Sequence, residues 1–188
     1  KNENDKKIFN KILAKADILV ENFKPGTLEK WGYGWKEVNQ KYPKLIYASA
    51  SGFGQTGPLK ELPAYDMVVQ GMGGLMSVTG QPNSEPTRVG TSIGDITAGL
   101  FTAIGVNAAL YDRQKTGKGM YIDVSMLDCQ IAILENAIAR YLAKNEIPKP
   151  MGSRHPSIAP FEAFKTKDSH IIIAAGNDKL FEKLCNIL

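Results

Sequence analysis

The sequence predicts an α/β protein built on a parallel sheet, because helical and strand patterns alternate along its first third. Apolar residues recur at helical spacing over residues 5–15, and the apolar segment 16–23 is typical of a short buried strand. The order then repeats, with a short helix over 35–43 that Pro43 ends and a second strand over 44–54. Helix, strand, helix, strand is the order found in parallel α/β sheets.

The centre of the chain adds longer helices and one more strand. Thr27 is expected to cap a single helical turn after residues 24–26. Beyond the second strand, the pattern predicts a helix that loosens into glycines over 65–80, a loop over 81–90, an apolar helix over 95–115, a strand over 120–125 and a helix of about five turns over 126–145.

A proline-rich segment, residues 146–160, separates this part from the C-terminal residues. The alternation over 161–176 predicts a hairpin, and 177–188 predicts a helix that Asn177 or Asp178 caps. We therefore expect three parts: a large domain over 1–147, a linker over 148–158, and the beginning of a smaller α+β domain over 159–188.

Composition favours a globular protein that acts on a small molecule. The chain is 43% hydrophobic and 22% charged, and its net charge of +4 suits an anionic ligand. Its basic residues are too scattered to indicate nucleic-acid binding. The two cysteines lack metal spacing, and no signal peptide or run of about 18 apolar residues is present, so we expect a cytoplasmic protein.

Several short patterns have simple structural interpretations. The glycines of GFGQTG, residues 52–57, match a dinucleotide fingerprint, but Pro58 follows where that fingerprint needs a helix. Capping or surface roles suffice for Asp123 and Asp128. His155 and His170 indicate no metal site, and whether His155 contacts a substrate stays open.

Two other segments carry candidate chemistry. ENFKPG, residues 21–26, follows a predicted strand, and ligands of open α/β sheets bind beyond the carboxyl ends of strands. A plain turn explains it equally well. Asp95 follows a glycine at the start of a long helix, where it would serve as an N-cap. The helix dipole would also keep this carboxylate ionised, which suits a nucleophile.

Taken together, these segments resemble the family III CoA-transferases, the group that includes formyl-CoA transferase and carnitine CoA-transferase. The matching pieces are ADILVENFKPG, YDMVVQGMGG, TSIGDITAGLFTAIGVNAALYDRQKTGKG and IDVSMLD, in family order over most of residues 8–143. The resemblance implies a Rossmann-like large domain, a smaller domain and an interlocked homodimer. It also implies that this chain is the middle half of such an enzyme and inactive alone.

The resemblance implies a covalent mechanism with Asp95 as the catalytic nucleophile. Its carboxylate would attack an acyl-CoA thioester and form an aspartyl acyl anhydride, followed by an aspartyl thioester to CoA. Further implied CoA contacts are Asn22, Phe23, Lys24, Lys30, Ala64, Tyr65 and Asp66. No metal and no tightly bound cofactor is implied, because the CoA thioester is itself a substrate. An acyl-CoA and a carboxylic acid would be the partners, with no nucleic acid and no membrane.

Two other functions remain in competition with CoA transfer. The racemases of 2-methylacyl-CoA in the same superfamily place a histidine where this chain has Tyr65, which favours the transferase. The third interpretation is a non-catalytic CoA-binding protein, against which the presence of Asp95 and Asn22 argues.

Overall fold

The computed structural model describes residues 2–188. In chain order the elements are α1 (Glu3–Leu13), β1 (Ile18–Glu21), α2 (Thr27–Lys30), α3 (Trp35–Lys41), β2 (Ile46–Ser51), α4 (Asp66–Met72), α5 (Leu75–Val78), α6 (Ile93–Thr116), β3 (Tyr121–Ser125), α7 (Met126–Ile133), α8 (Glu135–Lys144), β4 (Phe161–Lys165), β5 (His170–Ala174) and α9 (Asp178–Cys185).

These elements form two compact units. The first comprises Lys1–Leu75 with Val89–Glu135, and the second comprises Met76–Arg88 with Asn136–Leu188. The first unit contains the three-stranded sheet, and the second contains the β4–β5 hairpin and α9. The domain limits expected from the sequence divide the chain differently, and they stay a prediction.

The sheet of the first unit has the order β1-β2-β3, and all its strands are parallel. Ile18 pairs with Ile46, and Tyr47 pairs with Tyr121. This confirms the predicted α/β class with a parallel sheet. In the second unit β4 and β5 pair antiparallel, which confirms the predicted hairpin.

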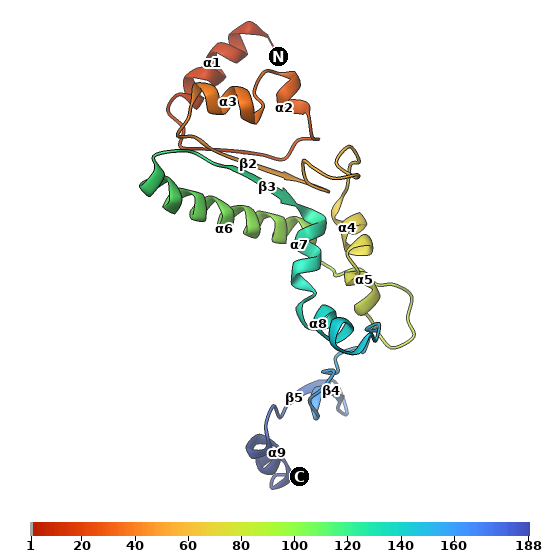
Figure 1. Cartoon of the computed structure of the whole chain (residues 1–188). Coiled ribbons are helices and arrows are strands. Elements are labelled where there is room, and N and C mark those ends of the chain that lie inside the picture. The colour runs from red at the N-terminus through yellow and green to blue at the C-terminus, as the bar shows by residue number, and fades with distance from the viewer. Residues whose placement is uncertain (1) are drawn as a thin grey trace. The chain divides into compact units, whose positions relative to one another are not determined.

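Helices cover both faces of the parallel sheet, so that its strands are apolar on both sides (Figure 1). On one face Tyr47 packs in a cluster with side chains of α1, α2 and α3, including Leu13, Leu28 and Val38. On the other face Ile46 and Ala48 pack against Val106 and Ala109 of α6. A third cluster joins α4, α6 and α7 through Val69, Ala98 and Cys129.

Several helix starts differ from those that the sequence predicts. Gly26, with a φ of 80°, is the N-cap of α2, and Thr27 is its first residue. Ser92 is the N-cap of α6, so Asp95 lies at the third helical position instead of capping the helix. Of the two caps expected for the last helix, Asn177 and Asp178, the structure has Asn177, whose side chain accepts a hydrogen bond from the Leu180 N–H.

The predicted single helix over 126–145 is two helices, α7 and α8. Glu135 adopts a φ of 33°, which a right-handed helix does not contain. Among residues 2–188, α6 is long and apolar enough to cross a membrane by length and composition alone, a test that core helices of globular proteins also pass.

Candidate active site at the carboxyl edge of the sheet

A cavity of about 1070 Å³ opens at the carboxyl edge of the sheet, within the first unit. Its wall combines the residues that follow β1, the end of β2, the segment 62–65, the residue after β3 and one face of α6. The carboxyl edge is where parallel α/β sheets bind ligands, and the volume lies at the upper end for small-molecule sites.

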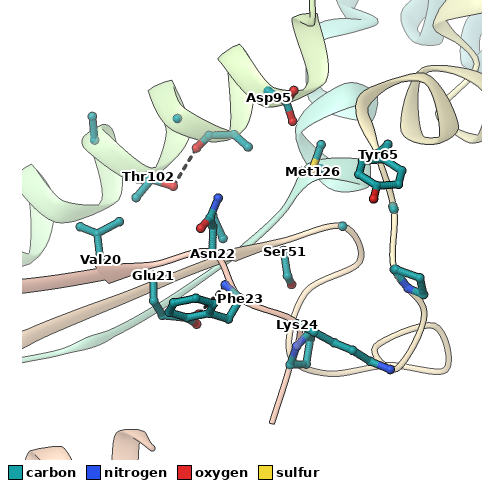
Figure 2. A pocket seen from close by; sticks show the side chains of 18 of the residues that line it. Val20, Glu21, Asn22, Phe23, Lys24, Ser51, Tyr65, Asp95, Thr102 and Met126 are labelled. Atoms are coloured by element: carbon teal, nitrogen blue, oxygen red, sulfur yellow. Dashed lines mark hydrogen bonds between the residues drawn. The ribbon is translucent and has the colours of Figure 1, made fainter. Parts of the chain in front are cut away.

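The segment after β1 contributes polar, aromatic and cationic side chains to this wall. Asn22, Phe23 and Lys24 all line the cavity, and all three side chains are exposed (Figure 2). The Phe23 N–H donates a hydrogen bond of 2.8 Å to Oε2 of Glu21, and the Phe23 ring meets Trp31 edge to face at 5.4 Å. The turn is therefore fixed while its side chains remain available to a ligand.

Asp95 lies on the opposite wall, in the first turn of α6 (Figure 2). The side chain is exposed, and no residue within 2–188 donates a hydrogen bond to its carboxylate. At this position the carboxylate lies at the positive end of the helix dipole. Asp95 thus presents an unpaired carboxylate to the cavity.

The start of α6 is held against α4 by Asp66. Oδ1 of Asp66 accepts a hydrogen bond of 2.7 Å from the Gly94 N–H, directly before Asp95. The approach is close, because a Cβ at Gly94 would lie 2.8 Å from Cγ2 of Val69 and 2.9 Å from Oδ1 of Asp66. A glycine before Asp95 is therefore a packing requirement of this contact.

The other site residues predicted from the sequence fall into two groups. Ala64 and Tyr65 line the cavity. Ala64 packs tightly on Gly52, because a Cβ added at Gly52 would lie 2.5 Å from the Ala64 Cβ. Asp66 is buried and Lys30 is exposed at the end of α2, and neither contributes to the cavity wall. Their roles in CoA binding stay predictions.

Sequence reasoning missed several residues of the wall, including Ser51, Thr102, Asn107 and Met126. Ser51 is 8% exposed, and its hydroxyl has no hydrogen-bond partner among the described residues. Its place as the last residue of β2 is the signal that sequence reasoning had available. Thr102 instead donates to the Ala98 carbonyl at 2.7 Å, so its hydroxyl is already engaged (Figure 2).

The glycine-rich loop 52–57 is braced by Asp123. Both carboxylate oxygens of Asp123 lie 3.0 Å from the Gln55 nitrogen, whose N–H they accept. Gly54 and Gly57 have positive φ values of 79° and 84°, which turn the chain back over the strand ends. Asp123 is exposed, but partial desolvation raises the pKa of its carboxyl, the Gln55 N–H opposes this shift, and the nearby charge of Asp128 adds to it.

His155 has a local role in the second unit. Its Nδ1 accepts hydrogen bonds from the N–H groups of Ser157 at 3.2 Å and Ile158 at 3.1 Å, and its ring packs on Phe161 at 5.2 Å. Within residues 2–188, no group of three or more His, Cys, Asp or Glu side chains is placed to hold a metal ion.

Comparison with known proteins identifies relatives over the whole chain. The acetyl-CoA:oxalate CoA-transferase of Acetobacter aceti is 48% identical over 189 residues, which cover 100% of this chain and 49% of the relative. The human succinyl-CoA:glutarate CoA-transferase is 40% identical over 182 residues, covering 97% of this chain and 42% of the relative. The chain thus spans about half the length of the curated relatives that it matches.

Solved structures agree with this assignment of the fold. The crystal structure of a CAIB/BAIF family protein from Brucella suis superposes with a TM-score of 0.89 at 42% identity, over 99% of this chain and 49% of that one. The family model described as CoA-transferase family III matches residues 1–188. The chain therefore belongs to CoA-transferase family III.

Proposed function

We propose that the whole protein transfers CoA from an acyl-CoA to a carboxylic acid, with Asp95 as the covalent nucleophile. The observation that carries this proposal is the state of the two carboxylates in the cavity wall. Glu21 accepts the Phe23 N–H, whereas Asp95 accepts no hydrogen bond from the described residues. Asp95 is therefore the carboxylate that is free to react.

The proposed reaction is a sequence of acyl transfers through Asp95. An oxygen of Asp95 attacks the thioester carbonyl of the donor, the C–S bond breaks, and CoA thiolate leaves a mixed anhydride behind. The thiolate then attacks the aspartyl carbonyl of the anhydride, which releases the donor acid and leaves an aspartyl thioester to CoA. Thioesters and anhydrides are close in energy, so each step is reversible.

The second half repeats these steps with the acceptor. The acceptor carboxylate attacks the aspartyl thioester and displaces CoA thiolate, which forms a second mixed anhydride. The thiolate attacks the acceptor carbonyl of this anhydride, and the Asp95 carboxylate leaves. Backbone N–H groups of glycine-rich loops would stabilise the oxyanions formed in these steps.

The wall opposite Asp95 suits the nucleotide end of CoA. Lys24 supplies a positive charge for phosphate, Phe23 an apolar face, and the Asn22 amide both donors and acceptors. Lys30, Ala64, Tyr65 and Asp66 complete the set of CoA contacts that we propose from the family resemblance. A homodimer and a cytoplasmic location belong to the same proposal.

The relatives favour a dicarboxylic acid as the acceptor. Oxalate and glutarate, which the names of the relatives from Acetobacter aceti and human contain, are both dicarboxylic acids. The net positive charge of the chain suits such an anion.

The test is chemical trapping in the full-length protein that contains this chain. Incubation with succinyl-CoA, followed by hydroxylamine and peptide mass spectrometry, is expected to yield a hydroxamate on Asp95. Asp95→Ala should keep the affinity for CoA and lose at least about 10³-fold in transfer rate, because the covalent route is closed. Unchanged turnover in this variant would show that Asp95 is not the nucleophile.

Other results would favour the competing functions. Exchange of the α-proton of a 2-methylacyl-CoA with solvent, without transfer of CoA, would point to a racemase. Tight CoA binding by wild-type protein, with neither transfer nor proton exchange, would point to a non-catalytic binding protein.

A further inference from the structure

Gln70 connects the Asp66 side chain with the backbone of the segment 89–91, which leads into α6. It is fully buried on α4, one turn after Asp66, and it does not line the cavity. Its Nε2 donates a hydrogen bond of 2.7 Å to Oδ2 of Asp66, and its Oε1 accepts one of 2.9 Å from the Val89 N–H. Nε2 also lies 3.5 Å from the Thr91 carbonyl oxygen.

These contacts form a continuous chain that ends beside Asp95. Gln70 fixes Oδ2 of Asp66, while Oδ1 of the same carboxylate holds the Gly94 N–H. Gln70 also holds the segment 89–91 that leads into α6, through Oε1 at the Val89 N–H and through Nε2 at the Thr91 carbonyl. The amide side chain matches its surroundings, because it donates to a carboxylate and accepts from a backbone N–H at the same time.

We propose that Gln70 is a positioning residue for Asp95: it fixes the start of α6 so that the Asp95 carboxylate meets the thioester carbon. This inference rests on the proposed function. Gln70 touches no part of the cavity, so its effect passes through Asp66 and the segment 89–94. A small displacement of a reacting group costs about 100-fold in rate.

Two substitutions and one matched control test the proposal in the full-length protein. Gln70→Met keeps the approximate volume and removes all amide contacts. Gln70→Glu keeps an acceptor for the Val89 N–H but places a second carboxylate against Asp66. The control is Gln130→Met, because Gln130 is also fully buried but donates only to the Thr97 hydroxyl, at 3.1 Å.

We expect Gln70→Met to lower kcat and the rate of hydroxamate formation on Asp95 by about 100-fold, with KM for the acyl-CoA changed by less than about twofold. Gln130→Met should lower Tm to a similar extent and leave kcat within about twofold of wild type. In Gln70→Glu, the two carboxyl groups share a proton at low pH. Its kcat relative to wild type should therefore recover as pH falls from about 8 to about 6.

The proposal is overturned if Gln70→Met retains kcat, if kcat falls equally in both methionine variants, or if the Gln70→Glu ratio does not change with pH. Absence of a hydroxamate in wild type contradicts the proposed function instead. In that case, amide hydrogen exchange over residues 89–96 tests whether Gln70 fixes the start of α6. Faster exchange in Gln70→Met than in Gln130→Met supports this role of Gln70, and equal exchange in the two variants contradicts it.

Discussion

At the scale of single residues, Asp66 and Asp95 show how two acids near helix starts acquire opposite properties. Asp66 is 9% exposed, and both of its oxygens accept hydrogen bonds from protein donors. Asp95 is exposed and has no donor among the described residues. A carboxylate that accepts a hydrogen bond at each oxygen is held in place, whereas an unpaired one is free to act as a nucleophile. Local sequence did not separate these two roles, because each acid lies in a first helical turn.

A third acid, Asp123, leads to a prediction about pH. Asp123 is exposed, but partial desolvation of its carboxyl raises the folded-state pKa, so ionisation of Asp123 carries a small, solvent-screened cost in folding stability. This cost is absent below the unfolded pKa of about 3.9 and grows as pH rises through the folded pKa. Asp123→Asn retains an oxygen to accept the Gln55 N–H. We therefore expect the Tm of this variant relative to wild type to increase between about pH 4 and pH 7.

The measurement is a thermal melt of each full-length protein at several pH values. Asp168→Asn removes the same charge at another exposed position, between β4 and β5, and serves as the control. A Tm difference that stays flat for Asp123→Asn, or that declines as pH rises, would contradict the prediction.

At the scale of elements, strands and long helices could be predicted from the sequence, whereas the break between α7 and α8 and the caps of α2 and α6 could not. Apolar residues identified β1, β2 and β3, as expected for a sheet with helices on both faces, although the structure buries most of β2 and no residue of β1. The break in the helix at Glu135 could not be predicted from a glycine or a proline, because neither residue lies near it in the sequence. Periodicity continues through it, and α7 buries Cys129 and Gln130 whereas α8 buries no residue in this chain. Tertiary packing, which local pattern does not report, separates these two helices.

Gly119 gives a prediction for the pairing of β3 with β2. A Cβ at this position would lie 2.0 Å from the Leu45 carbonyl oxygen, and a backbone atom cannot move aside as a flexible side chain does. The Gly119 N–H also donates a hydrogen bond of 2.7 Å to the Pro43 carbonyl. Gly119→Ala is therefore expected to lower the free energy of unfolding by about 3 kcal/mol, because it forces the two segments apart.

Denaturant unfolding of the full-length protein would measure this loss. Gly90→Ala is the matched control, since a Cβ at Gly90 meets no atom within 4 Å. A loss in Gly119→Ala no larger than that in Gly90→Ala would contradict the steric explanation.

At the scale of the whole molecule, the position of the candidate site could be predicted from topology, but its full wall could not. Asn22 follows a strand, and strand ends of a parallel sheet meet at one edge, where the cavity lies. Ser51 lines the cavity because the end of β2 lies beside the segment 62–65. This is a tertiary contact, which local sequence does not predict. Lys30 is absent from the wall, although the next residue, Trp31, contacts Phe23 of the wall, and no local pattern indicated this difference.

Helix α6 reaches both edges of this sheet, and its far end supplies the last prediction. Arg113 lies 18 residues after Asp95, about 27 Å along the helix. Its guanidinium donates to the Lys44 carbonyl at 2.9 Å, to the Asp17 carbonyl at 3.3 Å and to the Asp17 carboxylate at 2.9 Å. These contacts tie α6 to the chain just before β1 and β2, at the amino edge of the sheet.

Because the Asp17 side chain is 74% exposed, its ion pair with Arg113 contributes little, and the bonds to the two carbonyls carry most of the effect. We expect Arg113→Met to lower the free energy of unfolding by about 1–3 kcal/mol. KM and kcat should stay at wild-type values at temperatures where the variant is folded, because the cavity lies at the other edge. Lys115→Met, which removes an exposed charge from the same turn, should cost less than about 1 kcal/mol. A loss of kcat in folded Arg113→Met would mean that the two ends of α6 are coupled, so that the hold at the amino edge also sets the position of Asp95.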